Sequence, residues 1–314
     1  MAHETGTGKY EALVARCKSL APVTTAVVHP CEQSALAGAA EAAAEGLITP
    51  IYVGPKDRIA EIAAKGGIDL RSAEIIDASP SHAAAQQAVA LVREGRAELL
   101  MKGSLHTDEL LGAVVARDSG LRTGRRISHV FIMDVPTYHK VLIVTDAAIN
   151  IAPSLEDKVD ICQNAIDLAV SLGLKQPKVA ILAAVETVTS KMPATLDAAA
   201  LCKMAERGQI RNAVLEGPLA FDNAISRDAA RTKGIESEVA GDPDILLAPD
   251  LEAGNILAKL LNFLAKADSA GLVLGARVPI ILTSRADSVR ARIASCAVAM
   301  LAAHARRATA AVAS

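Results

Sequence analysis

The sequence has very few aromatic side chains. Phe, Trp and Tyr together make up 2% of its 314 residues, and Trp is absent. Proteins that bind single-stranded nucleic acids stack the bases on aromatic rings, so this scarcity argues against such a function. It also predicts a core built mostly from Ala, Val, Leu and Ile.

The chain has no excess of charge of either sign. Its 33 Lys and Arg residues nearly balance 35 Asp and Glu residues, which gives a formal net charge of −2. Such a balance creates no basic field to hold a nucleic-acid backbone or an anionic membrane. We therefore expect neither nucleic acid nor membrane as a partner.

Paired cysteines and long hydrophobic runs are also missing. The five cysteines form no C-x-x-C pair and have no close Cys/His spacing, which predicts reduced, mostly buried thiols. No apolar run reaches the roughly 18 residues that a membrane span requires, and the N-terminus has no apolar signal segment. We expect a cytoplasmic protein.

Short β-branched runs alternate with longer Ala/Leu-rich segments. The runs predict strands at 24–28, 48–53, 129–133, 141–144, 179–183, 212–215, 245–247 and 278–282. Between them the pattern predicts helices at 31–45, 81–94, 107–118, 155–172, 196–207 and 251–266. This alternation predicts a doubly wound α/β fold with mostly parallel sheets. At about 150 residues per domain, the length suggests two lobes.

Ligands of such folds bind at the carboxyl ends of the strands, so the residues after each apolar run are the first candidates. In the segment 101–108, Lys102 offers a cation and Gly103 a close backbone approach, while Ser104 and Thr107 supply hydroxyls near a helix start. This pattern fits a phosphate site. It also fits, and from the pattern alone rather favours, a helix capped by Thr107, a solvated Lys102 and a structural His106.

A second candidate segment is 283–288, which precedes a long Ala-rich region. Ser284 and Asp287 match a capping box at the start of a helix. Arg285 beside that cap would place a guanidinium where helix amides converge, which suits a phosphate or an acyl phosphate. The two interpretations are compatible.

Other patterns stay open. Asp146 with Asn150, and Asp250 with Glu252, could bind a hard cation, although nothing in the spacing brings their carboxylates together. We therefore predict no metal site. The basic turn of Arg122, Arg125 and Arg126 either meets a phosphate or is a solvated loop.

Five segments in this order resemble the phosphate acetyltransferase and phosphate butyryltransferase family. They are KGSLHT, SHVFIMDVPTYHKVLIVTDAAINIAP, LEGPLAFDNAIS, PDLEAGNILAKLL and PIILTSRADS, and with their spacing they cover the chain from about residue 100 to 295. The first 95 residues resemble the family only in the alternation of strands and helices.

The resemblance implies a reversible reaction, in which acyl-CoA and inorganic phosphate give acyl phosphate and CoA. It implies two α/β/α lobes like those of isocitrate and isopropylmalate dehydrogenases, with the site in the cleft between them. One lobe would comprise 1–138 and 268–314, and the other 139–267. It further implies a homodimer, CoA as a co-substrate, and no tightly bound cofactor.

The resemblance also assigns roles to residues. Ser284 and Arg285 would act on the reacting carbonyl and phosphate. The phosphate or acyl phosphate would contact Lys102, Ser104, His106, Thr107, Thr145, Asp146 and Asn150. CoA would contact Gly254, Asn255 and Arg277.

The chain departs from the acetyl branch of that family at three places. An Asp seven residues after the Ser is the usual base, and here it is Ala291, so Asp287 is the closest carboxylate and His106 a substitute. Leu111-Gly112 replaces Arg-Pro, and Phe263 replaces an Arg. The last two changes resemble the butyryl branch and suggest an acyl group longer than acetyl.

Two other functions remain open at this stage. One is a metal- and NAD-dependent decarboxylating dehydrogenase of related fold, which would need converging Asp ligands. The other is a non-catalytic module that binds acyl-CoA or phosphorylated metabolites.

Overall fold

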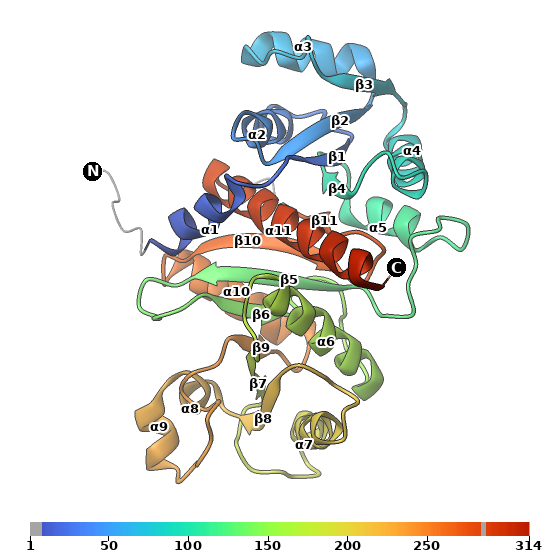
Figure 1. Cartoon of the computed structure of the whole chain (residues 1–314). Coiled ribbons are helices and arrows are strands. Elements are labelled where there is room, and N and C mark those ends of the chain that lie inside the picture. The colour runs from blue at the N-terminus through green and yellow to red at the C-terminus, as the bar shows by residue number, and fades with distance from the viewer. Residues whose placement is uncertain (1–7, 284–286, 314) are drawn as a thin grey trace. The chain divides into compact units, whose positions relative to one another are not determined.

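The computed structural model describes residues 8–283 and 287–313, with side chains described up to residue 309. The chain divides into two compact units (Figure 1). We call Tyr10–Arg125 with the chain from Ala270 onward the N-terminal unit. The central unit is Arg126–Ser269 with the segment that ends at Lys9. The division falls at the start of α1, between Arg125 and Arg126, and within β10.

In the N-terminal unit six strands follow the order β3-β2-β1-β4-β11-β10. All neighbours are parallel except β10 and β11, which pair antiparallel. The strands are β1 (Val23–Val28), β2 (Ile48–Gly54), β3 (Glu74–Asp77), β4 (Leu99–Lys102), β10 (Asp268–Leu274) and β11 (Ile280–Ile281). The helices are α1 (Lys9–Cys17), α2 (Gln33–Ala44), α3 (Lys56–Gly66), α4 (Ser81–Arg93), α5 (Thr107–Val115) and α11 (Val289–Ala313).

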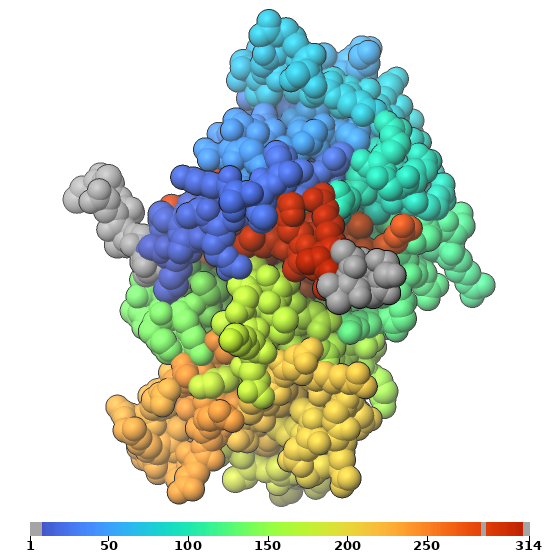
Figure 2. Space-filling view, viewed as in Figure 1, coloured from blue at the N-terminus to red at the C-terminus, as the bar shows by residue number. Residues whose placement is uncertain are grey.

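The long helix α11 packs along α1 and α2 of the same unit, and in Figure 2 its red surface lies against their blue surface. Cys17 Sγ lies 3.6 Å from the carbonyl oxygen of Ala297, and Arg290 pairs with Glu11 at 2.9 Å. Because α11 comes from the C-terminal part of the chain, this unit is assembled from both ends of the sequence.

In the central unit the strands follow the order β5-β6-β9-β7-β8. Only β5 and β6 are antiparallel. The strands are β5 (Ser128–Asp134), β6 (Leu142–Thr145), β7 (Lys178–Leu182), β8 (Val214–Leu219) and β9 (Ile245–Leu247). The helices are α6 (Leu155–Ser171), α7 (Pro193–Glu206), α8 (Phe221–Ile225), α9 (Arg227–Thr232) and α10 (Leu251–Phe263).

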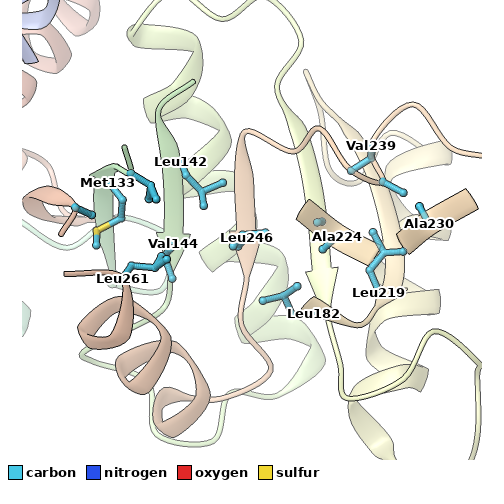
Figure 3. Packing of buried hydrophobic residues seen from close by; sticks show 14 residues of the cluster. Met133, Leu142, Val144, Leu182, Leu219, Ala224, Ala230, Val239, Leu246 and Leu261 are labelled. Atoms are coloured by element: carbon cyan, nitrogen blue, oxygen red, sulfur yellow. The ribbon is translucent and has the colours of Figure 1, made fainter. Parts of the chain in front are cut away.

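Small aliphatic side chains fill the core of the central unit (Figure 3). Val144 of β6 and Leu246 of β9 are fully buried, and Leu261 of α10 covers this side of the sheet. Helices α6 and α10 lie on opposite faces of the sheet (Figure 1). The sparse aromatic content is thus compatible with a complete core, because parallel strands covered on both faces need only small aliphatic side chains.

The mixed α/β architecture with mostly parallel strands is confirmed. Several elements differ from the expectation: β3, β10, α1, α3, α8 and α9 had no predicted counterpart, and the strand predicted at 278–282 is reduced to Ile280–Ile281. The compact units also divide at residue 126 rather than 138, because β5 pairs with β6 along Val130–Met133. No described helix has the length and hydrophobicity to cross a membrane.

Candidate active site

The turn after β4 is fixed by a close backbone approach. A Cβ atom at Gly103 would lie 2.3 Å from the Val28 carbonyl oxygen and 2.6 Å from that of His29, so only glycine fits there. The Gly103 amide donates to Val28 at 2.9 Å. Lys102, partly buried at the end of β4, donates to the carbonyl of Gly103 at 3.3 Å.

The Ser104 hydroxyl ties this turn to the end of β1. It donates to the carbonyl of His29 and accepts from the Cys31 amide, both at 2.7 Å. A hydroxyl has one hydrogen to donate. Ser104 therefore positions the backbone of the candidate phosphate site, and it would donate to a phosphate only by releasing His29.

Helix α5 begins directly after this turn. Its N-cap is the exposed His106 in an extended conformation, with φ −70° and ψ 149°, and no side chain caps the helix. The interpretation of Thr107 as the N-cap is wrong, because Thr107 is already the first helical residue. The first-turn amides of a helix lack acceptors within the helix, so this end of α5 offers N–H donors close to Lys102 and Ser104 in the sequence.

In the central unit, Asp146 follows β6 and is almost fully buried. One carboxylate oxygen accepts from the amides of Ala148 and Ile149, at 2.9 and 3.2 Å. The other accepts from the backbone and side-chain amides of Asn150. Four N–H donors therefore use the carboxylate to close a tight turn. This engagement argues against Asp146 as a cation ligand or a free base.

Thr145 and Asn150 extend this network. The buried Thr145 hydroxyl donates to the carbonyl of His129 at 2.9 Å. Asn150 Nδ2 donates to the carbonyl of Ile127 at 2.9 Å, while its Oδ1 accepts from Arg126 Nε at 2.8 Å. The turn after β6 and the start of β5 are thereby held together at one edge of the sheet.

Arg126 is thus positioned by a residue of the predicted site. Its Nη1 lies 3.4 Å from Asp157, and its side chain remains 54% exposed. Its backbone amide donates to Asp160 at 2.8 Å. The geometry favours an anchored guanidinium over a solvated loop, since the side chain is oriented and still open to solvent.

Gly254 and Asn255, expected to contact CoA, support the Asp146 turn from α10. A Cβ atom at Gly254 would lie 2.2 Å from the Asp146 carbonyl oxygen. Only a glycine therefore allows α10 to approach the Asp146 turn this closely. Asn255 Nδ2 donates to the Ala147 carbonyl at 2.9 Å. Asp250 caps α10, because its carboxylate accepts from the Ala253 amide at 2.8 Å. One oxygen of the Asp250 carboxylate, which could have bound a hard cation, is therefore already engaged.

The remaining site residues lie in the C-terminal part of the N-terminal unit. Ser284 and Arg285 fall outside the described residues. The capping-box interpretation of Asp287 is wrong: α11 begins at Val289, and Ser288 Oγ accepts from the Ala291 amide at 3.1 Å. Asp287 therefore precedes the helix instead of lying in its first turn.

Arg277 is exposed, and its carbonyl accepts a hydrogen bond from Arg306. Burial, reinforced by the charge of Arg277, lowers the pKa of Arg306. The backbone amide of Arg277 donates to Leu121 at 2.8 Å. Two guanidinium groups thus lie close together here, an arrangement that suits an anion.

Each unit therefore gathers its predicted residues at the carboxyl edge of its own strands. In the N-terminal unit these are Lys102, Ser104, His106 and Thr107, and in the central unit they are Thr145, Asp146, Asn150, Gly254 and Asn255. Within the described part of the chain, no cluster of three or more His, Cys, Asp or Glu side chains could hold a metal ion.

Two histidines near these residues were not predicted as site residues. His29 follows β1, so the rule that ligands bind at strand ends could have identified it. His129 lies inside β5, where no such signal exists. Burial lowers the pKa of His129 to about 4, although the nearby Asp146 charge opposes this shift. A neutral imidazole is therefore part of the central unit's core.

In α/β proteins with parallel strands, ligands bind beyond the carboxyl ends of the strands, where these polar side chains lie. Comparison with known proteins identifies the family within that class. The family model described as phosphate acetyl/butaryl transferase matches residues 80–300.

Three relatives agree with this match. A phosphate acetyltransferase of Rhizobium meliloti is 66% identical over 300 residues, 96% of this chain and 95% of that protein. A phosphate butyryltransferase of Clostridium beijerinckii is 42% identical over 292 residues, 93% and 97% of the two chains. The crystal structure of a branched-chain phosphotransacylase from Enterococcus faecalis V583 is 30% identical, with a TM-score of 0.78 over 90% of this chain and 99% of that one.

The chain belongs to the phosphate acetyl/butyryl transferase family, and it is accordingly an acyltransferase. The resemblance drawn from the five sequence segments is confirmed. The comparisons favour neither the dehydrogenase nor the non-catalytic binding module.

Proposed function

We propose that this phosphate acyltransferase moves a short acyl group, acetyl or butyryl, between CoA and inorganic phosphate within a ternary complex. The observation that carries the proposal is the pair of anchored polar edges, one per unit, in a chain of this family. Binding both substrates side by side makes direct attack effectively intramolecular, so no covalent acyl-enzyme is needed.

In the direction of CoA acylation, the thiol sulfur attacks the carbonyl carbon of the acyl phosphate. The thiol proton passes to a base, the C–S bond forms, and the C–O bond to phosphate breaks. Arg285 would stabilise negative charge on the carbonyl oxygen and on the departing phosphate, and Ser284 would donate a hydrogen bond to the same group.

The other residues would bind and orient the substrates. We assign phosphate or acyl phosphate to the edge that carries Lys102, Ser104, His106 and Thr107. Thr145, Asp146 and Asn150 would face it from the second lobe, and Arg126 would contact a phosphate group there. Gly254, Asn255 and Arg277 would shape the CoA site. The two units would correspond to two lobes of a dehydrogenase-like fold around a cleft.

The free cysteines fit a mechanism without a thiol nucleophile. Burial raises the pKa of Cys162 and of Cys296 to about 12. Their thiols are therefore protonated at neutral pH and poor nucleophiles. We place the enzyme in the cytoplasm, where thiols stay reduced.

We further propose a homodimer that buries one face of α10. Ile256, Leu260, Phe263 and Leu264 follow helical spacing and are 64%, 46%, 67% and 77% exposed. Contiguous apolar stripes of this kind commonly mark a protein interface. A second copy of the chain would cover the stripe.

A thiol-release assay tests the reaction. The protein is given acetyl-CoA, propionyl-CoA and butyryl-CoA in turn, with and without inorganic phosphate. Phosphate-dependent CoA release supports the proposal and ranks the acyl groups; the 66% identity to an acetyltransferase favours acetyl. Dependence on a divalent metal with a nicotinamide absorbance change, or binding without turnover, would contradict it.

A further inference from the structure

A cavity in the N-terminal unit is lined by none of the residues assigned to the acyl transfer. It has a volume of about 490 Å³ and lies between α4 and α5, which are side by side in Figure 1. Cavities of roughly 300 to 1,000 Å³ are typical of small-molecule sites. This cavity therefore has room for a ligand considerably larger than inorganic phosphate.

Small apolar residues line the middle of the cavity. Gly112, Ala113 and Ala116 of α5 line it together with Val89 of α4. A Cβ atom at Gly112 would meet no atom within 4 Å, so this face of α5 borders open space. Glycine and alanine leave a shallow apolar surface, on which a flat ring can pack.

Arg93, the last residue of α4, contributes an anchored cation to the lining. Its Nη1 donates to the Asp118 carbonyl at 3.3 Å. Its stem lies beside Gly120, where a Cβ atom would be 3.2 Å from Arg93 Cδ. Among the residues that the structure describes, Arg93 forms no ion pair, not even with the exposed Asp118 carboxylate. Most of its five N–H donors are therefore open to an anion.

Glu109, in the first turn of α5, lines the same cavity. Its Oε2 is buried and has no hydrogen-bond partner within the described chain. Leaving a buried carboxylate oxygen without a donor is costly, and an N–H group of a ligand in the cavity would supply that donor.

The cation and the carboxylate are separated along α5. Glu109 lies six residues before the end of the helix at Val115, which is about 9 Å along the helix axis. The Arg93 guanidinium contacts a carbonyl three residues beyond that end. The lining therefore suits a molecule with an anion at one end and an N–H donor at the other.

This separation and the cavity volume select the class of ligand. An α-amino acid carries its charged groups on a single carbon atom and is too short. A nucleoside monophosphate is long enough, and its flat base suits the apolar middle. Its phosphate matches the planar N–H fork of a guanidinium.

We propose that this cavity binds a nucleotide whose base carries an amino group, with the phosphate on Arg93 and the amino group on Glu109. Two sources supply this chemistry: a free nucleotide such as AMP, and the nucleotide end of CoA. Only the second source rests on the proposed acyl transfer. Thr107 of the candidate phosphate site lies two residues before Glu109, so either ligand would contact the helix that begins at that site.

Isothermal titration calorimetry of the full chain with AMP tests the proposal. We expect saturable binding of one AMP per chain. Adenosine lacks the phosphate, and IMP has a carbonyl oxygen in place of the amino group. Each should bind at least about tenfold more weakly than AMP, because each loses a charge-assisted hydrogen bond. Absence of AMP binding, or equal affinity for all three compounds, would overturn the inference.

Titration of AMP into protein saturated with CoA separates the two sources. Displacement of one ligand by the other identifies the nucleotide end of CoA as the occupant, whereas an unchanged affinity for AMP identifies a free nucleotide. A protein that binds AMP but shows no phosphate-dependent CoA release would refute the proposed function and leave the nucleotide site standing.

Two variants assign the ends of the ligand. Arg93→Gln should weaken AMP binding at least about tenfold and keep the preference for AMP over IMP. Glu109→Gln should abolish that preference, because an amide can donate to the carbonyl oxygen of IMP. Arg117→Gln and Asp108→Asn, at exposed residues that do not line the cavity, are the matched controls.

Gly112→Leu tests the cavity itself. The side chain would enter the open space beside α5, and leucine favours a helix more than glycine does. AMP binding should be lost, while urea unfolding should show no loss of stability. Unchanged AMP binding in Gly112→Leu and Arg93→Gln would place the nucleotide elsewhere and overturn the inference.

Discussion

Hydrogen bonds fix the side chains at both sheet edges before any substrate binds. Ser104 reaches the carbonyl of His29, 75 positions earlier in the sequence, whereas Asp146 uses donors within four residues. The sequence showed the residue types at these positions. The partner of Ser104 could not be predicted, because it depends on the parallel pairing of β1 with β4.

Arg285 tests the chemistry at the scale of one residue. We expect Arg285→Ala to lower kcat by about two orders of magnitude or more, since it removes a cation from the charge that develops on the carbonyl oxygen and phosphate. Thermal unfolding should remain as in the wild type. Arg71→Ala, at a side chain that is 92% exposed, serves as the control. Near-normal kcat would remove Arg285 from the mechanism.

Arg126 tests substrate binding at the same scale. Arg126→Ala should raise KM for CoA or for phosphate about tenfold, because a charge-assisted hydrogen bond contributes roughly 1.5 to 3 kcal/mol. Initial rates with CoA, dephospho-CoA and varied phosphate would identify the anion that it contacts. Arg125→Ala changes the preceding residue. It should leave KM for CoA, for dephospho-CoA and for phosphate nearly unchanged. If the two variants behave alike, Arg126 has no binding role.

At the scale of elements, the strands and helices of the repeating β-α pattern were predictable, whereas their ends were not. The helix that follows 283–288 begins at Val289 because Ser288 provides its cap. Strand β10 was missed because its Ala, Ser and Gly residues weaken the β-branched signal, and burial between neighbours stabilises it instead.

Gly254 tests the packing of α10 against the Asp146 turn. An alanine Cβ would lie 2.2 Å from the Asp146 carbonyl oxygen, so Gly254→Ala should destabilise the fold by about 1 to 3 kcal/mol and reduce activity. Gly112→Ala in α5 meets no atom within 4 Å and should be stabilising by about 0.5 to 1 kcal/mol. Urea unfolding of both variants checks the pair. Equal free energies of unfolding for the two variants would refute the close approach of α10 to the Asp146 turn.

Asp242 lies at the end of the central unit's strands opposite to the Asp146 turn. Lys140 and Lys178 lie 3.0 and 2.8 Å from its carboxylate. Burial would raise the pKa of Asp242, but hydrogen bonds from these lysines outweigh it and hold the pKa well below the ordinary value of 3.8. The ionised group therefore stabilises the fold above about pH 4, and this contribution is lost as pH falls towards the folded pKa.

Asp242→Asn should accordingly lower the free energy of unfolding at pH 7 by about 2 kcal/mol, because the cations around it lose their partner. The difference from the wild type should shrink in acid. Denaturant unfolding at pH 7 and pH 3 measures both, with Asp228→Asn at a 93% exposed side chain as the control. A difference that grows in acid would contradict the assignment.

At the scale of the whole molecule, the apolar face of α10 predicts self-association. Phe263→Asp should convert a dimer into a monomer, because a charge in a packed apolar interface is left without a partner. Light scattering after size-exclusion chromatography reads the mass directly. Val289→Asp, at an exposed apolar residue on α11, should leave the dimer intact. A wild-type monomer would refute the proposed dimer.

The family was recognisable from the sequence because five segments keep their order and spacing. The acyl group could not be recognised in this way. Leu111 and Phe263 resemble the butyryl branch, whereas overall sequence identity is higher to the acetyltransferase relative, at 66%, than to the butyryltransferase relative, at 42%. Chain length depends on the shape of a pocket, which sequence motifs do not specify.

The most direct measurement of the central claim is ³¹P NMR of the purified protein with acetyl-CoA and inorganic phosphate. The account predicts an acyl phosphate resonance that grows in step with CoA release, one for one, with EDTA present and without nicotinamide. Release of CoA with no acyl phosphate would indicate hydrolysis and contradict the account.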